Sequence, residues 1–326
     1  MKKLAYLILG LAALAAAGLT YLTLKSPNSA PPSTIRIEAT AARLERGRYI
    51  FGNLADCAGC HSERDWTKAG APVIAGRNGA GVAFPKELGL PGDIVAPNIT
   101  PDPTTGIGTW TDGEKIRAIR EGVSKDGRAL FPFMPYKGYR HMSDEDVQSL
   151  VVYLNALPPV NHAVARTKLN FPVNLFIKDA PQPVTVPVAA PQTSNPAKYG
   201  EYLVNLGGCR DCHTQQERGT PKEGMLLAGG FVFHVGQFTV LSANITPEVE
   251  TGLGSWSEQR FIDKFRGYSG HTPETAAQAT QANFTLMPWT NLSRLTDQDL
   301  KALYAFLRTV KPVKNAVEPH KPLTLP

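Results

Sequence analysis

The sequence predicts an all-α protein made of two similar helical halves that follow an apolar N-terminal segment. Four short motifs each occur twice in the same order, at separations of 146 to 153 residues. Near the end of each half, apolar residues recur at the i, i+3, i+4, i+7 spacing of an amphipathic helix. No segment shows sustained alternation of period two, so any strands are expected to be short.

The composition fits a globular chain of two domains. The chain has 326 residues, of which 42% are hydrophobic and 19% are charged, and this length allows two cores of ordinary size. Its 29 glycines and 27 prolines indicate long irregular loops. The net charge of +6 is spread along the chain, whereas a nucleic-acid binder concentrates basic residues in a patch. We therefore expect no nucleic-acid partner.

An apolar run dominates residues 1–25. Lys2 and Lys3 precede it, and no further charge occurs before Lys25. Its length favours a retained membrane anchor over a cleaved signal peptide. The alternative is cleavage near Ala15-Ala16-Ala17, which would leave a soluble periplasmic protein. In both cases the lysines stay in the cytoplasm and the rest is exported. Residues 26–36 are rich in proline and serine and are expected to form a linker.

The internal repeat organises the remaining chain into domains at 37–165 and 197–326, joined by a Pro-rich linker at 166–196. The four repeated motifs are Cys57-Ala58-Gly59-Cys60-His61 and Cys209-Arg210-Asp211-Cys212-His213, Asn98-Ile99-Thr100-Pro101 and Asn244-Ile245-Thr246-Pro247, Thr105-Gly106-Ile107-Gly108-Thr109-Trp110 and Thr251-Gly252-Leu253-Gly254-Ser255-Trp256, and Phe133-Met134-Pro135-Tyr136 and Leu286-Met287-Pro288-Trp289.

Helix boundaries follow from capping residues. We expect helices before the cysteine pairs, at 43–55 and 198–206. Thr111 and Ser257 are predicted N-caps, and the helix after Thr111 is predicted to end at Gly122. The last helix of each half begins with a predicted capping box: the pairs are Ser143 with Asp146, and Thr296 with Asp299.

The two Cys-x-x-Cys-His motifs predict covalent haem. Two thiols on one helical turn can both form thioethers with a porphyrin edge, and the adjacent histidine can bind the iron. Cys57, Cys60, Cys209 and Cys212 are therefore candidate attachment residues, and His61 and His213 candidate iron ligands. The weaker hypotheses are a redox-active dithiol and a four-cysteine zinc site.

A methionine lies at the matching place in both halves and is the candidate sixth ligand. Met134 follows His61 by 73 residues, and Met287 follows His213 by 74. Thioether ligation favours ferrous iron and raises its potential. Among the rivals, His141 and Met142 correspond to Arg294 and Leu295 in the second half. Met225, His162, His234, His271 and His320 are expected to be surface or packing residues.

Several other features are expected to be structural. Trp110, Trp256, Tyr49 and Tyr202 are predicted to pack in the core or beside the haem. The glycine-rich segment 76–81 lacks the context of a dinucleotide loop and is at most a shield for the haem. Asn98, Asn244, Asn283 and Asn291 lie in N-x-[ST] sequons, a pattern that also arises by chance.

These motifs resemble a known family. The two halves are similar to class I cytochrome c domains, and residues 98–159 are similar to the cytochrome subunits of bacterial membrane-bound alcohol, aldehyde and gluconate dehydrogenases. The resemblance implies two covalently bound haem c groups, held by Cys57, Cys60, His61 and Met134, and by Cys209, Cys212, His213 and Met287. Those subunits typically carry three haem motifs, and this sequence has two.

The expected function is single-electron transfer without catalysis. The expected electron donor is a dehydrogenase, and the acceptor is a cytochrome, a quinone or an oxidase. The expected location is the periplasmic side of the inner membrane. The main alternative is a two-haem peroxidase or small-molecule oxidoreductase acting at one iron, which needs an open sixth position. A haem-based sensor or assembly subunit is a third hypothesis.

Overall fold

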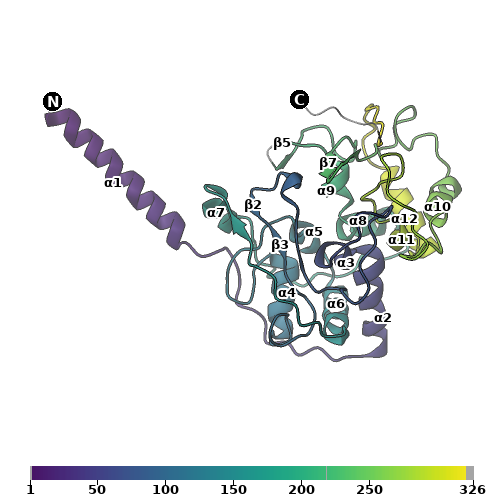
Figure 1. The fold of residues 1–326 in the computed structure, drawn as a ribbon, viewed down its shortest axis with the longest axis horizontal. Helices are drawn as coiled ribbons and strands as arrows, with labels where there is room; N and C mark the ends of the chain where they lie inside the picture. Colours follow the sequence, from purple (N-terminus) through teal and green to yellow (C-terminus); the bar gives the residue numbers. More distant parts are fainter. Residues whose placement is uncertain (1, 218, 321–326) are drawn as a thin grey trace.

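The computed structural model describes residues 2–217 and 219–320 and shows a two-part body from which one long helix projects (Figure 1). This helix, α1 (Lys2–Leu24), contains no buried residue. Its hydropathy and length are sufficient to cross a membrane. The predicted 26–36 linker lies against the body, because the Ser33 carbonyl packs on Gly113 and the Ile37 N–H donates to Asp112.

Each half of the body repeats one helical plan. The helices of the first half are α2 (Ala41–Tyr49), η1 (Ile50–Leu54), α3 (Cys57–His61), α4 (Asp112–Glu121), α5 (Tyr136–Tyr139) and α6 (Asp144–Ala156). Those of the second half are α8 (Pro196–Leu206), α9 (Cys209–His213), α10 (Glu258–Arg266), α11 (Trp289–Leu292) and α12 (Asp297–Leu307). The short helices α7 (Val173–Phe176) and η3 (Ile177–Asp179) lie between the halves, and η2 (Lys86–Leu88) lies within a loop.

The all-α prediction is correct for the main elements but omits four antiparallel strand pairs. Three pairs have two residues per strand: β1 (Val82–Ala83) with β3 (Val95–Ala96), β2 (Gly92–Asp93) with β4 (Lys168–Leu169), and β5 (Gln216–Glu217) with β6 (Thr220–Pro221). The fourth, β7 (Val232–Val235) with β8 (Phe238–Leu241), has four. Alternation over so few residues gives no clear periodic signal.

The first and last helices of each half cross at a glycine. A β-carbon on Gly47 of α2 would lie 2.0 Å from the Ser149 carbonyl oxygen of α6. The equivalent atom on Gly200 of α8 would lie 1.8 Å from the Ala302 carbonyl oxygen of α12. Only glycine permits this approach of two backbones. The repeated crossing therefore sets the frame on which both cysteine motifs are built.

A π-helical turn distinguishes the two halves. From Tyr49 to Cys57 the chain advances eight positions, whereas from Tyr202 to Cys209 it advances seven. The additional residue falls where η1 continues α2 as a π-helix. A π-turn accommodates one extra residue inside a helix, so both tyrosines and both cysteine motifs keep equivalent positions.

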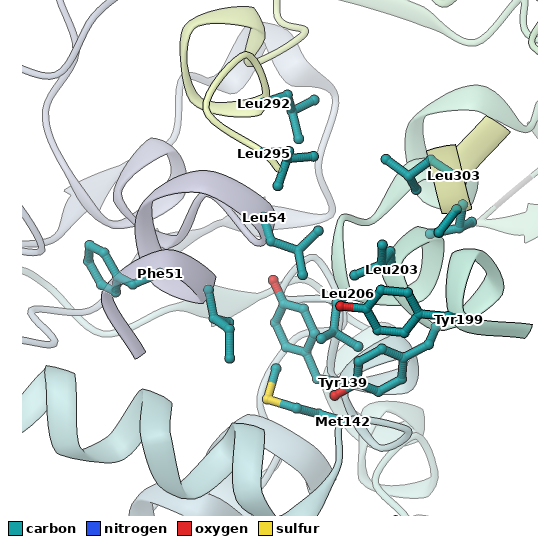
Figure 2. Packing of buried hydrophobic residues seen from close by; sticks show 14 of the residues in the cluster. Phe51, Leu54, Tyr139, Met142, Tyr199, Leu203, Leu206, Leu292, Leu295 and Leu303 are labelled. Atoms are coloured by element: carbon teal, nitrogen blue, oxygen red, sulfur yellow. The ribbon is translucent and has the colours of Figure 1, made fainter. Parts of the chain in front are cut away.

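The two halves share one hydrophobic core. Figure 2 shows Leu54 of η1 near Tyr139 of α5, with Leu206 of α8 close by. Leu292 and Leu295 from the second half belong to the same cluster. η1 contacts α11 and α5 contacts α8, so each half offers equivalent elements to the other. This reciprocal pattern describes a pseudo-two-fold interface.

Two tyrosines connect the halves across this interface, which corrects their assignment as simple core aromatics. The Tyr202 hydroxyl donates to Asp146 Oδ2 (2.5 Å) and accepts from the Ser143 N–H (3.1 Å). Tyr49 makes the equivalent bonds to Asp299 and the Thr296 N–H. The predicted capping boxes are therefore half right. Ser143 and Thr296 cap their helices, but a tyrosine from the other half binds the N-cap N–H.

The Pro-rich segment at 181–196 is also fixed to the body along part of its length. The Asp144 N–H donates to the Val188 carbonyl (2.8 Å), and the Val184 N–H donates to Glu121 Oε1 (3.1 Å). The Arg140 guanidinium also donates to Gln182 (2.9 Å). These contacts hold the segment across α4 and the start of α6, so a freely mobile linker is not observed there.

The variant Tyr202→Phe is expected to lower the free energy of unfolding by about 1–3 kcal/mol, because buried Asp146 and the Ser143 N–H lose a partner. Burial and Asp146 raise the pKa of Tyr202 above its ordinary value of 10.0. A raised folded-state pKa stabilises the fold below pH 10, and that stabilisation is lost as the pH rises further. Denaturant unfolding at pH 8 and at high pH measures both effects.

The control for that experiment is Tyr153→Phe. Within the described residues, the Tyr153 hydroxyl makes no hydrogen bond, although its ring packs on Phe51. The control should retain parental stability at pH 8, and the difference between Tyr202→Phe and the parent should shrink at high pH. Equal stability of Tyr202→Phe and the parent at pH 8 would contradict the interdomain role.

Candidate functional site

The two cysteine motifs form short helices that begin at the first cysteine and end at the histidine. Asp56 precedes α3 in the left-handed region (φ 45°), and its side chain accepts from the Gly59 N–H (3.1 Å). Gly208 takes the left-handed conformation before α9 (φ 63°). Both thiols of each motif thus lie on one helical turn, as thioether attachment requires. Cys60 and Cys212 are exposed, whereas Cys57 and Cys209 are half-buried.

Both histidines are oriented by a backbone carbonyl. His61 Nδ1 lies 2.8 Å from the Pro97 carbonyl oxygen, and His213 Nδ1 lies 2.7 Å from that of Ala243. Because Nδ1 must donate to a carbonyl, Nε2 carries the lone pair that can bind a metal. Burial lowers the pKa of both imidazoles. The neutral form that a metal needs is therefore favoured.

A tight loop packs on each histidine from the backbone side. The Gly81 N–H donates to the His61 carbonyl (2.7 Å), and the Gly229 N–H donates to the His213 carbonyl (2.8 Å). A β-carbon on Gly81 would lie 2.7 Å from the Asn98 nitrogen, and one on Gly229 would lie 2.4 Å from the Ala243 carbonyl carbon. The glycine-rich segment 76–81 is thus part of the site framework.

The Asn-Ile-Thr-Pro repeat holds this loop in place. Asn98 Nδ2 donates to Thr105 Oγ1 (3.0 Å) and to the Val160 carbonyl (2.8 Å). Asn244 makes the equivalent bonds to Thr251 and Val313. Asn98 and Asn244 are buried, so these two sequons are structural. The sequence contained the signal, since the repeat preserves the asparagine and both threonines.

The candidate methionines occupy equivalent loops beside aromatic anchors. Tyr136 and Trp289 each donate a backbone N–H to the carbonyl of the preceding methionine, Met134 or Met287 (both 2.8 Å). Tyr136 is buried beside Gly122, the residue at which α4 ends as predicted. Trp289 stacks on Tyr268 with ring centroids 4.8 Å apart.

Half-burial distinguishes these methionines from their nearest rival. Met134 and Met287 are half-buried and pack against the shared core. Met142 is fully buried, and Figure 2 shows its sulfur within the hydrophobic cluster. Its counterpart Leu295 is equally buried. Met142 therefore serves packing.

The remaining predicted packing residues have structural contacts. His162 Nδ1 bonds the Ala80 carbonyl (2.9 Å), and His234 Nδ1 bonds Thr239 (2.9 Å). His271 packs on the Tyr268 ring. Trp110 and Trp256 are half-buried against the core, as expected.

The environment of the thiols disfavours the two rival interpretations of the motif. Burial and then Asp56 raise the pKa of Cys60 to about 11. Burial, followed by Asp211 and Cys60, raises the pKa of Cys212 to about 12. Redox-active dithiols need a lowered pKa. Across residues 2–217 and 219–320, no three His, Cys, Asp or Glu side chains gather as a metal-binding group, so a four-cysteine zinc site is not formed.

The two motifs lie on either side of the interface between the halves. A β-carbon on Gly207 would lie 3.5 Å from both the Leu54 carbonyl oxygen and Cys209 Sγ. Asn291 of α11 donates to Asp56 Oδ1 (2.6 Å), directly before the first motif. Sequence reasoning missed Asp56 and Asn291, because their contact joins residues far apart in the chain.

Comparison with known proteins agrees with this geometry. The family model for cytochrome c matches residues 44–158 and 197–311, so each half contains one match. This chain belongs to the cytochrome c family. Its two cytochrome c domains, each with a Cys-x-x-Cys-His motif, give the protein two covalently attached haem c groups.

Similar proteins include both subunits of dehydrogenases and a protein of the same size. The fructose dehydrogenase cytochrome subunit of Gluconobacter japonicus is 32% identical over 89% of this chain and 58% of its own length. The cytochrome c subunit of the quinone alcohol dehydrogenase of Gluconacetobacter polyoxogenes is 29% identical over 85% and 58%. A di-haem cytochrome of Cereibacter sphaeroides is 30% identical over 94% and 98%. The chain thus spans less than two thirds of the two dehydrogenase subunits.

The residues present fit two haem c groups. In each cytochrome c domain, an exposed and a half-buried thiol lie on one turn. The next residue is a histidine with its Nδ1 engaged. The loop behind that histidine has no space for a side chain at Gly81 or Gly229.

Proposed function

We propose that this cytochrome relays single electrons from a dehydrogenase to an acceptor of the respiratory chain, which is a cytochrome, a quinone or an oxidase. The observation that carries the proposal is the reciprocal interface, which brings the ends of η1 and α8, and therefore both attachment motifs, together. Haem iron supplies one-electron chemistry when bound. The chain attaches, ligates and shields it.

Each iron is assigned two protein ligands. In the first domain, running from 37 to 165, Cys57 and Cys60 form the thioethers, and His61 and Met134 bind the iron. In the second, from 197 to 326, Cys209 and Cys212 attach the haem, and His213 and Met287 bind the iron. The carbonyls of Pro97 and Ala243 position the imidazoles, and a hydrogen-bonded histidine is a more basic ligand.

The proposed location is the periplasmic side of the inner membrane. At 1.5 Å per residue, the 23 residues of α1 extend about 34 Å, enough to cross a hydrocarbon core of about 30 Å. Lys2 and Lys3 favour a cytoplasmic N-terminus. The named relatives suggest the donor, since the printed names include fructose and alcohol dehydrogenase cytochrome subunits.

Carbon monoxide is expected to leave the spectrum of the reduced native protein unchanged. If methionine sulfur occupies the sixth position of both irons, no site is open to an added ligand. A peroxidase or other haem enzyme needs one open or displaceable position. The measurement is an absorption titration of the dithionite-reduced holoprotein. The urea-unfolded protein is the positive control, because unfolding releases the methionines. Stoichiometric binding to one native haem would favour the enzymatic alternative.

A further inference from the structure

A short segment of the body is attached to the end of the proposed anchor. Figure 1 shows α7 beside the end of α1 that joins the body. Lys178 Nζ donates to the carbonyls of Leu22 (3.2 Å) and Thr23 (2.6 Å) in the last turn of α1. Lys25, directly after α1, pairs with Asp179, and the Asn28 N–H donates to the Lys178 carbonyl (3.4 Å). A cation at a helix C-terminus is stabilising.

This segment carries the two most exposed phenylalanines of the body. Phe171 is 73% exposed and Phe176 is 55% exposed, whereas Leu175 between them is buried and fixes α7 to the body. The segment lies between the two cytochrome c matches, which end at 158 and resume at 197. Exposed aromatic rings are therefore concentrated in the part of the body that holds the anchor.

We propose that Phe171 and Phe176 insert into the headgroup region of the outer leaflet and fix the orientation of the body on the membrane. The proposal rests on α1 being a retained anchor. Leu24 is the last residue of α1, so the hydrocarbon region ends near it. Phe176 is two residues from Lys178, whose ammonium touches that turn, and this places its ring at the depth where aromatic side chains concentrate.

The charges around the segment suit the same partner. Lys168 on β4 and Lys178 are basic, and the acidic Asp179 is paired with Lys25. Basic residues close to a membrane surface are attracted by anionic headgroups. A docking subunit is the rival occupant. Lipid is favoured because the exposed rings adjoin the end of the apolar helix.

The test places the photoreactive p-benzoylphenylalanine at position 171 or 176 of the full-length holoprotein. Reconstitution uses liposomes of phosphatidylethanolamine and phosphatidylglycerol. After irradiation, mass spectrometry of peptides measures lipid adducts. Val249→p-benzoylphenylalanine is the control, because Val249 is 64% exposed and lies in the loop leading to α10, on the side of the body away from α1 (Figure 1). Retention of both haems shows that each variant is folded.

A several-fold excess of lipid adducts at 171 and 176 over 249 is expected. Floating liposomes that carry the protein, with no such excess, would overturn this proposal and leave the anchor intact. Protein that fails to float would overturn the anchor and this proposal together. Irradiation in the membranes of the producing cells tests the rival, since adducts to another protein at 171 or 176 in place of lipid would also overturn it.

Discussion

Replacing Met134 by alanine is expected to lower the midpoint potential of one haem by on the order of 0.1–0.3 V, within the roughly 0.8 V range that axial ligands control. Thioether ligation stabilises ferrous iron, and alanine offers no donor. The same haem should then bind carbon monoxide, while both haems stay attached. A spectroscopic redox titration, with the carbon monoxide spectrum of the reduced protein, measures both effects.

The matched control is Met142→Leu. Met142 is fully buried, and the second half has Leu295 at this position, so leucine should preserve packing and both potentials. Met287→Ala should lower the potential of the other haem instead. An unchanged potential and spectrum for Met134→Ala would show that Met134 is not a ligand.

Replacing Cys57 and Cys60 together by serine is expected to leave one covalent haem in place of two. Serine cannot form a thioether, and Cys209 and Cys212 are unaffected. The first domain should also lose stability, because its half-buried residues at the site, Cys57 and Met134 among them, pack on the core that both halves share. Intact mass and a haem stain after denaturing electrophoresis measure the loss.

The reciprocal variant, Cys209→Ser with Cys212→Ser, provides the control. It should also retain one haem, and its spectrum should differ from that of the first variant, because the two sites have different neighbours. The Met134 loop is anchored by Tyr136 beside Gly122, whereas the Met287 loop is anchored by Trp289 on Tyr268. Two attached haems in either double variant would contradict the assignment of the thioether cysteines.

Much of the fold could be predicted because its signals are local. Thr111, Ser257 and Gly122 cap helices where the sequence indicated. The helix predicted over 43–55 ends as the π-turn η1, a departure that becomes visible only when both halves are compared. Capping and amphipathic spacing depend on residues within a few positions of each other.

The features that were missed depend on contacts between distant segments. The β7–β8 hairpin forms a second small core with Phe284, on which Trp66 and Leu88 from the first half pack. The loops also pair directly, since the Ala279 N–H donates to the Thr67 carbonyl (2.7 Å). A four-residue strand has no periodic signal of its own. Its stability comes from residues more than forty positions away.

At the candidate site, the sequence was sufficient to find the chemistry but not its support. The cysteines, histidines and methionines follow from motif and repeat. The carbonyls of Pro97 and Ala243, which orient the imidazoles, belong to residues whose side chains carry no functional signal. Backbone groups of this kind are recognised only once the chain is folded.

The exchanged tyrosines have a consequence for symmetry. Tyr49 and Tyr202 each reach the start of the other half's last helix, so surface i of one half meets surface j of the other and j meets i. Such a contact is isologous, the kind that builds a closed homodimer. The chain therefore has the geometry of a C2 dimer of one-haem subunits fused end to end, and severing the peptide between the halves would leave the pairing surface complete.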